Sequence, residues 1–297
     1  MDRYHLCVAW NWEYDADFVA LLQRACHDRS LSLLQITPDN VATCCAALQS
    51  AQLAFGALLD RASDADPQFL PVVHWAEQHG VLNANPRDKA RRAWDKAAMH
   101  VDLISAGLPV PNAIILPSFS EQPEIGAPDL SALGPSFSIK PACQGGGQGV
   151  VNAAASMAEV QAARREFPDD RYLLQAHVRP MRLDPGEAWF RVIYCFQQVH
   201  PCWWDVRSHV YRPVFHTEQT QHALDGLCEL TARVAAVCGL ELFSTEVALT
   251  EEDDFVIVDY VNDPLDLRLQ SQAVDGVPDV IVEAIAQRLA QVAARQS

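Results

Sequence analysis

A lysine followed by a cluster of glycines is the first feature of this sequence that is suited to chemistry. The apolar, strand-like stretch Phe137–Ile139 leads into Lys140, and a glycine-rich loop follows. The glycines of that loop are Gly145, Gly146, Gly147 and Gly149. Glycine lets backbone N–H groups turn around phosphate oxygens without a Cβ clash, and a lysine beside the loop supplies a compact positive charge. The pattern indicates a polyphosphate site, although a glycine-rich turn between two strands has the same appearance.

A second set of polar residues lies further along the chain, in a predicted hairpin. The apolar stretch Gly239–Leu249 carries Glu246, acidic residues then predict a turn, and Phe255–Pro264 predicts the returning strand. Adjacent strands place such side chains close together, so we expect Glu246 beside Asp259 or Asn262. Carboxylate and amide oxygens are the hard ligands that Mg²⁺ prefers. The lysine, the glycine loop and these oxygens together predict a site for a nucleotide and its metal ion.

With this loop and this acidic hairpin, the sequence resembles the ATP-grasp superfamily, in particular its branch of glutathione synthetases and ribosomal-protein-modifying carboxylate–amine ligases. The resemblance covers most of the chain. Asn83–Pro111 is similar to the segment that enters the family's ATP-binding region, and it places Lys96 at the first nucleotide-contacting lysine. Lys140 falls at the second. Tyr172–Val178 is similar to the strand and hinge that carry adenine. The adenine contacts that this likeness implies are Gln175, Ala176 and Val178.

The chain departs from the family pattern around the hinge. Ala176 stands where family members usually have Glu, and Trp189 stands where an acid usually precedes Arg191. Because that acid is missing, the resemblance implies that Glu187 or Asp184 binds the ribose hydroxyls.

The metal motif also differs from the family pattern. The spacing from Asp259 to Asn262 is longer by one residue than in the usual Glu-x-Asn, and no Pro-Gly follows. A β-bulge would still direct both side chains at the same metal ions. The expected metal ligands are therefore Glu246, Asp259 and Asn262, with Asp263 as the alternative to one of them.

The resemblance implies an ATP-dependent carbon–nitrogen ligase. Lys96, Lys140 and the glycine loop would neutralise and cover the phosphates of ATP, while Mg²⁺ bridges them. A substrate carboxylate would attack the γ-phosphorus to give an acyl phosphate, and an amine would displace phosphate to form an amide or peptide bond. Arg191 and Arg207, with Lys140, would hold the transferring group. Positioning and charge neutralisation do most of the work in such a reaction.

The substrates implied are a small-molecule carboxylate and an amine, such as an amino acid or peptide. Arg268 follows the metal strand, where an arginine can hold a carboxylate through two parallel hydrogen bonds; the alternative is that it only pairs with Asp266 or Asp263. The tryptophans Trp10, Trp12, Trp203 and Trp204 are candidates to line an acceptor pocket, and the alternative for each is core or rim packing. Two other functions remain open, a small-molecule kinase that phosphorylates a hydroxyl and a noncatalytic nucleotide-binding module.

The elements that must position these residues predict an α/β protein. Strands alternate with helices in the first part of the chain, which favours a small parallel sheet. The resemblance implies an ATP-grasp architecture with an N-terminal Rossmann-like domain, a small lid and a C-terminal mixed-sheet subdomain. The corresponding ranges are 1–94, 95–178 and 179–297.

Composition limits the other function classes. The 297 residues carry a formal net charge of −16, which argues against a nucleic acid or an anionic membrane as partner. The nine cysteines show no CxxC spacing, so reduced thiols are expected instead of disulfides or a zinc site. No apolar run is long enough for a membrane span, and the sequence opens on a strand pattern instead of a signal peptide, so we expect a cytoplasmic protein. The oligomeric state stays open, with a homodimer among the options.

Overall fold

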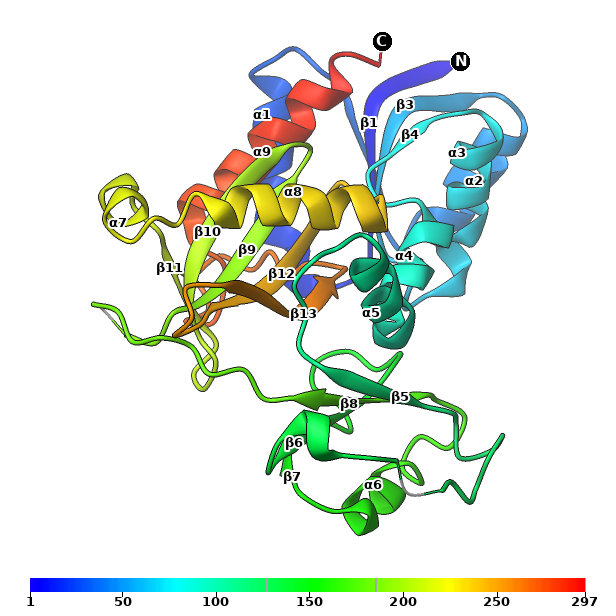
Figure 1. The fold of residues 1–297 in the computed structure, drawn as a ribbon. Helices are drawn as coiled ribbons and strands as arrows, with labels where there is room; N and C mark the ends of the chain where they lie inside the picture. The colour runs from blue at the N-terminus through cyan, green and yellow to red at the C-terminus, as the bar shows by residue number, and fades with distance from the viewer. Residues whose placement is uncertain (127, 185, 297) are drawn as a thin grey trace.

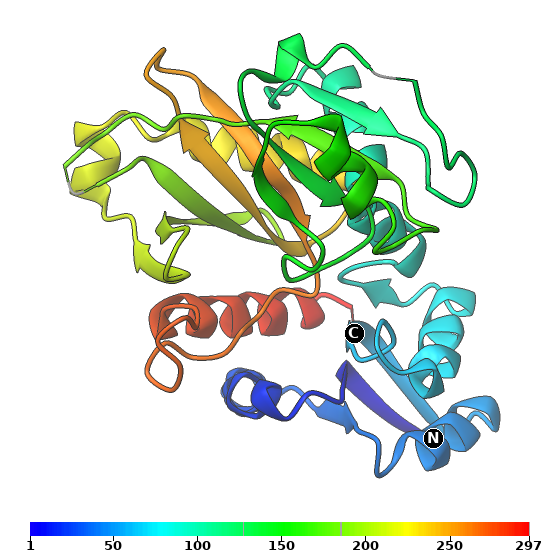
Figure 2. The ribbon, with the colours of Figure 1, turned by 90° about the horizontal axis from the view of Figure 1, so that it is seen from below.

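The computed structural model describes residues 1–126, 128–184 and 186–296, which form three sheets joined by helices (Figure 1). Each sheet is built from its own stretch of the chain. The two sheets that follow the first are in contact, since Lys140 of one donates to the Val258 carbonyl of the other, and α9 (Asp279–Ala293) then returns to the first sheet (Figure 2).

The first sheet is parallel, as the alternation of strands and helices predicted, and its strand order is β2-β1-β3-β4. The strands are β1 (Asp2–Trp10), β2 (Leu33–Ile36), β3 (Leu53–Arg61) and β4 (Leu82–Asn83). The helices are η1 (Glu13–Asp15), α1 (Ala16–His27), α2 (Val41–Gln49), η2 (Pro67–Phe69) and α3 (Leu70–Gln78). Side chains of β1 alternate between two cores, with Val8 packed on the α1 side and Cys7 on the α2 and α3 side.

The second sheet is antiparallel, has the order β5-β8-β6-β7, and carries the glycine loop between β6 and β7. Its strands are β5 (Ala113–Leu116), β6 (Phe137–Pro141), β7 (Val151–Ala154) and β8 (Tyr172–Ala176). The helices before and around it are α4 (Arg87–Trp94), α5 (Lys96–Ser105), η3 (Ser131–Leu133) and α6 (Met157–Ala163). We refer to this sheet with α6 as the lid sheet.

One expectation for the lid sheet needs correction. The sequence favours a helix over 153–166 with Ser156 as its N-cap, but β7 occupies 151–154 and the helix begins at Met157, after Ser156, whose hydroxyl accepts the Glu159 N–H. The sequence also predicts a loop or a weakly ordered connection over 117–135, and the described residues there form a loop apart from the short η3. The fully buried Arg164 holds the start of this loop, because its guanidinium donates to the carbonyls of Pro117, Ser118 and Gln122.

The third sheet has the order β11-β10-β9-β12-β13 and is antiparallel between every pair of its strands, so the expected mixed sheet was wrong. Its strands are β9 (Trp189–Cys195), β10 (Gln198–Asp205), β11 (Val210–Pro213), β12 (Leu242–Leu249) and β13 (Phe255–Asn262). Phe196 and Gln197, both with positive φ, turn β9 directly into β10. So short a connection permits only antiparallel neighbours.

Helices cover both faces of the third sheet. α7 (His216–Gln221) and α8 (Gly226–Cys238) follow β11, and α8 packs on one face, in front of the sheet in Figure 1. α9 packs on the other face and also against α1, so one apolar core contains Ile193 of β9, Ile285 of α9 and Phe18 of α1. No helix among the described residues is long and apolar enough to cross a membrane.

We predict that Gly149→Ala destabilises the lid sheet. Gly149 has φ +68°, and a Cβ on it would lie 2.5 Å from the Phe167 ring and 2.9 Å from Pro141. Strain and overpacking of this kind typically cost about 1–3 kcal/mol. Chemical denaturation with urea measures the loss. Gly145→Ala is the matched control, since a Cβ at Gly145 meets no atom within 4 Å; equal stability of the two variants would contradict the prediction.

Candidate active site

The β12–β13 hairpin brings the predicted acids together. Glu246 is paired with Asp259 in the strand register, and Ser244 is paired with Asn262. The register shifts on both sides of the Glu246 pair, so β13 bulges where its sequence is longer than the family motif. The amide of Asn262 donates to the Ser244 carbonyl at 3.4 Å. The juxtaposition of the two acids expected from the sequence is therefore present, and the extra residue is absorbed by the bulge.

Two cations approach these acids from different sheets. Arg191 lies opposite Glu246 on β9, with 3.2 Å between its Nη1 and Oε1 of the carboxylate. Lys140 of the lid sheet donates from Nζ to the carbonyl of Val258 at 3.4 Å, which places it over β13. Burial lowers the pKa of Lys140 and the nearby Lys96 lowers it further, while Asp259 and Glu246 oppose the shift. The site therefore contains two acids and two cations whose formal charges cancel.

Glu246 has a pKa raised well above its usual value. Burial raises its pKa from 4.5 to about 7, and the charge of Asp259 adds to the rise while Arg191 and Lys140 oppose it. A buried carboxylate beside a second carboxylate favours a proton or a metal ion over a bare negative charge. The pair is therefore suited to a divalent cation.

The described residues contain no group of three or more His, Cys, Asp or Glu side chains that is placed to hold a metal ion. Glu246 and Asp259 would thus supply only part of a coordination shell. This fits Mg²⁺, which usually takes one or two protein carboxylates and completes its shell with phosphate oxygens and water.

Lys96 lies at the base of the glycine loop. It is the first residue of α5, capped by Asp95, whose carboxylate accepts the N–H groups of Ala97 and Ala98. The backbone N–H of Lys96 donates to Ala142 at 2.9 Å, and its Nζ donates to the Gln144 carbonyl at 2.5 Å. Both predicted lysines and the loop are therefore brought to the same place. Within the loop, the glycines with positive φ are Gly146, Gly147 and Gly149.

The predicted adenine hinge is occupied by protein contacts at two of its three positions. The buried amide of Gln175 donates to the Val258 carbonyl at 3.2 Å and to the Tyr260 hydroxyl at 3.1 Å. The backbone N–H of Ala176 donates to Asn112 at 2.9 Å. Val178 is half-buried beyond the end of β8. The side chain of Gln175 thus ties the lid sheet to β13, and its predicted adenine contact stays a prediction.

The link from Gln175 to the third sheet extends one step further and was not predicted. The Tyr260 hydroxyl also lies 2.6 Å from Nδ1 of the buried His100 on α5. Burial lowers the pKa of His100. The only sequence signal for this series of hydrogen bonds is that Gln175, Tyr260 and His100 are polar residues within apolar stretches. Such residues are common in protein cores, so the signal is weak.

Asp263, the alternative metal ligand, has other partners. One carboxylate oxygen accepts the amide of Asn85 at 2.6 Å and the other accepts the indole N–H of Trp94 at 3.0 Å. Burial raises its pKa to about 6. Since both oxygens are engaged, Asp263 anchors the end of β13 to the segment before α5, and the geometry favours Asp259 at the metal site.

Arg268 is engaged in ion pairs. Its guanidinium lies 2.7 Å from Asp266 and 3.0 Å from Asp275, and it also lies over the Trp12 ring at 5.9 Å from the centroid. The pairing with Asp266 is the alternative weighed above for this residue. A role in substrate binding stays a prediction, and it would require the ligand to compete with two carboxylates.

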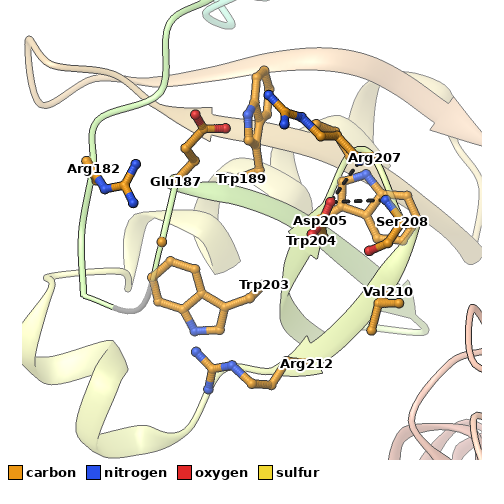
Figure 3. Close-up of a pocket in the computed structure, with 12 residues that line it drawn as sticks. Arg182, Glu187, Trp189, Trp203, Trp204, Asp205, Arg207, Ser208, Val210 and Arg212 are labelled. Atoms are coloured by element: carbon orange, nitrogen blue, oxygen red, sulfur yellow. Dashed lines mark hydrogen bonds between the residues drawn. The ribbon is translucent and has the colours of Figure 1, made fainter.

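Glu187 and Arg207 both line a pocket of about 640 Å³ that lies apart from the acid pair, at the β10–β11 end of the third sheet (Figure 3). The residues around it are Arg182, Gly186, Glu187, Trp189, Trp203, Trp204, Asp205, Val206, Arg207, Ser208, Val210 and Arg212. Trp204 joins the pocket to the acid pair, because the Arg191 guanidinium lies over its ring at 4.8 Å. Trp203 and Trp204 are buried and also line this pocket, and their role in an acceptor site stays a prediction.

We predict that Glu246 makes the protein less stable as the pH rises. Between pH 4.5 and about 7 the folded state binds more protons than the unfolded chain, so the free energy of unfolding falls through this window and levels off above it. Relative to Glu246→Gln, wild type should lose roughly 2–3 kcal/mol between pH 4.5 and 8. Urea titrations at stepped pH measure the difference. Glu251→Gln, in the exposed turn, serves as the control; parallel profiles for wild type and Glu246→Gln would show the idea to be wrong.

Comparison with known proteins identifies the fold. No family model matches the sequence, and no curated protein matches it. The structure is similar to the ATP-grasp ligase PsnB, solved with a minimal precursor, Mg and ADP, with 13% identity, a TM-score of 0.64 and 98% of each chain covered. It is also similar to a RimK domain ATP-grasp protein from Sphaerobacter thermophilus, with 18% identity, a TM-score of 0.61 and 96% and 98% of the two chains covered.

A third similar structure is the D-alanine–D-alanine ligase from Bacillus anthracis, solved with ATP, with 10% identity, a TM-score of 0.63 and 100% of each chain covered. These alignments extend over nearly the whole of both chains, through the lid sheet and the third sheet that hold the acids and cations described above. The chain therefore has the ATP-grasp fold.

Proposed function

We propose that the protein is an ATP-dependent carboxylate–amine ligase that acts through an acyl phosphate. The observation that carries the proposal is the convergence of Lys140 from the lid sheet with Glu246, Asp259 and Arg191 from the third sheet. The similar structures with nucleotide or magnesium bound support it, because they share this fold. The three proposed units are residues 1–94, 95–178 and 179–297.

The residues divide the work by charge. Lys96, Lys140 and the glycine loop would bind the phosphates of ATP, and Glu246 and Asp259 with Asn262 would hold Mg²⁺. Mg²⁺ would supply positive charge to the phosphate oxygens. Arg191 already lies 3.2 Å from Glu246, so a cation bound by that carboxylate would release the guanidinium to contact the transferring phosphoryl group. We keep the hinge as the proposed contact to adenine. Asp184, the alternative to Glu187, is the proposed contact to ribose, because Glu187 lies in the separate pocket at the β10–β11 end of the sheet.

The chemical steps require no nucleophilic side chain. A carboxylate oxygen of the first substrate attacks the γ-phosphorus, the bond to the β-phosphate oxygen breaks, and ADP leaves. The amine of the second substrate then attacks the acyl carbon, phosphate leaves, and the amine loses a proton as the amide forms. The protein contributes alignment and charge neutralisation, which are the main sources of rate in phosphoryl transfer.

The first test is nucleotide binding. ATP with Mg²⁺ should raise the thermal midpoint, since a ligand at about a hundredfold excess over its Kd adds roughly 2.7 kcal/mol of stability. Lys140→Ala should remove most of this shift because the lysine lies within the charge cluster. The Lys89 side chain instead packs against Gly239, so Lys89→Ala should keep the thermal shift. An equal loss in both variants, or no shift in wild type, would refute the assignment of the lysine.

The second test is turnover. With a panel of carboxylates and amines, phosphate release should need both substrates, and hydroxylamine should trap the acyl phosphate as a hydroxamate. Asp259→Asn should lower kcat by about a hundredfold or more, yet leave the protein as stable or more stable, because it removes like-charge repulsion from Glu246. Asp263→Asn is the matched comparison and should cost stability, since it weakens the contacts with Asn85 and Trp94. Phosphate transfer to a hydroxyl without any hydroxamate would instead indicate a kinase.

A further inference from the structure

The pocket beside Trp204 combines aromatic walls with unpaired charges. Trp189, Trp203 and Trp204 contribute indole rings, and Arg182 and Arg207 stand on opposite sides of the opening (Figure 3). Arg182 comes from the segment before β9, whereas Arg207 comes from the turn between β10 and β11. The volume of about 640 Å³ is that of a small-molecule site.

The two guanidinium groups have no protein partner. Within the described part of the chain, neither the Arg182 nor the Arg207 guanidinium takes part in an ion pair or hydrogen bond, whereas Arg212 on the same pocket is paired with Glu218 at 2.8 Å. Asp205 accepts the backbone N–H groups of Arg207 and Ser208 and so shapes the turn. In a chain with a net charge of −16, two arginines left unpaired at one pocket mark a place for a carboxylate.

Glu187 adds a complementary charge. It lies opposite Arg182 in an antiparallel backbone bridge, its side chain is exposed at the pocket, and within the described residues it forms no ion pair. A carboxylate there suits an ammonium group. The pocket thus offers cations, an anion and apolar walls, which match the carboxylate, the amine and the side chain of one amino acid.

We propose that this pocket binds the amine substrate, an amino acid with an aromatic side chain whose own carboxylate is held by Arg182 and Arg207. The inference rests on the proposed ligase function, which requires an amine next to the acyl phosphate. Trp204 lines the pocket and Arg191 lies over its ring, so two side chains, Trp204 and Arg191, connect a ligand here to Glu246. The carboxylate held by the arginines is spectator to the reaction, and the amine faces Glu187.

The test is direct binding without ATP, by isothermal titration calorimetry on the full chain. L-phenylalanine should bind at least about tenfold more tightly than L-phenylalaninamide, which lacks the carboxylate, or glycine, which lacks the ring. Arg182→Gln and Arg207→Gln should each weaken L-phenylalanine about tenfold, as expected for loss of a charge-assisted hydrogen bond. Arg91→Gln, exposed on α4, should have no effect. Unchanged thermal midpoints establish that the variants are folded.

Three results would overturn the inference: no preference for L-phenylalanine, no effect of the two arginine variants, or competitive displacement by ATP, which would assign the pocket to the nucleotide. Phosphate-release assays on the same preparation separate this inference from the ligase proposal. Turnover with other amines but no binding of L-phenylalanine contradicts only the pocket assignment. Binding as described, without any ATP turnover, contradicts the ligase and leaves the amino acid site standing.

Discussion

The charge arrangement of the site depends on two half-buried carboxylates held next to each other. Glu246 and Asp259 are fixed as neighbours by the register of β12 and β13, and the backbone cannot separate them without unpairing the strands. Their repulsion is offset by Arg191 within the sheet and by Lys140 from the lid sheet. Arg191 reduces the cost of the acid pair within the third sheet, and Lys140 reduces it further when the lid sheet is docked on the third sheet.

This arrangement gives the contact between lid sheet and third sheet a polar character. Lys140 and Gln175 both donate to the carbonyl of Val258, which lies in the bulged part of β13. A bulge exposes backbone groups that a regular ladder would use. The irregularity that keeps Asp259 beside Glu246 thus also presents the acceptor that receives the lid sheet, so one insertion in the strand serves two contacts.

How much could be read from the sequence differed between local and distant features. The glycine loop, the acidic hairpin and the alternation of β1 to β3 with their helices were visible, because each depends on residues near one another in the chain. The partners of Asp263 were not, since Asn85 and Trp94 lie 178 and 169 residues away. The same holds for the pocket around Arg207, which needs the segment before β9 and the β10–β11 turn to meet. The hairpin of β12 and β13 was predicted, but the resemblance implied a mixed sheet, and the two-residue turn at Phe196 and Gln197 contains no glycine that would have indicated the antiparallel β9–β10 pair.

The position of α9 has a consequence for the order of events during synthesis. Its apolar face fills one core together with α1 from the first sheet and with β9 and β10 from the third. Until residues 279–293 leave the ribosome, the shared core lacks the apolar side chains of α9. The apolar side chains of the two sheets that pack against α9 then stay accessible to solvent and to other chains. The strands of the first sheet are synthesised early, but the helix α9 that completes its core is synthesised last among the described elements. Before α9 is made, α1 is the only helix of the described chain that covers that side of the first sheet, so contact with a chaperone would be most useful in this interval.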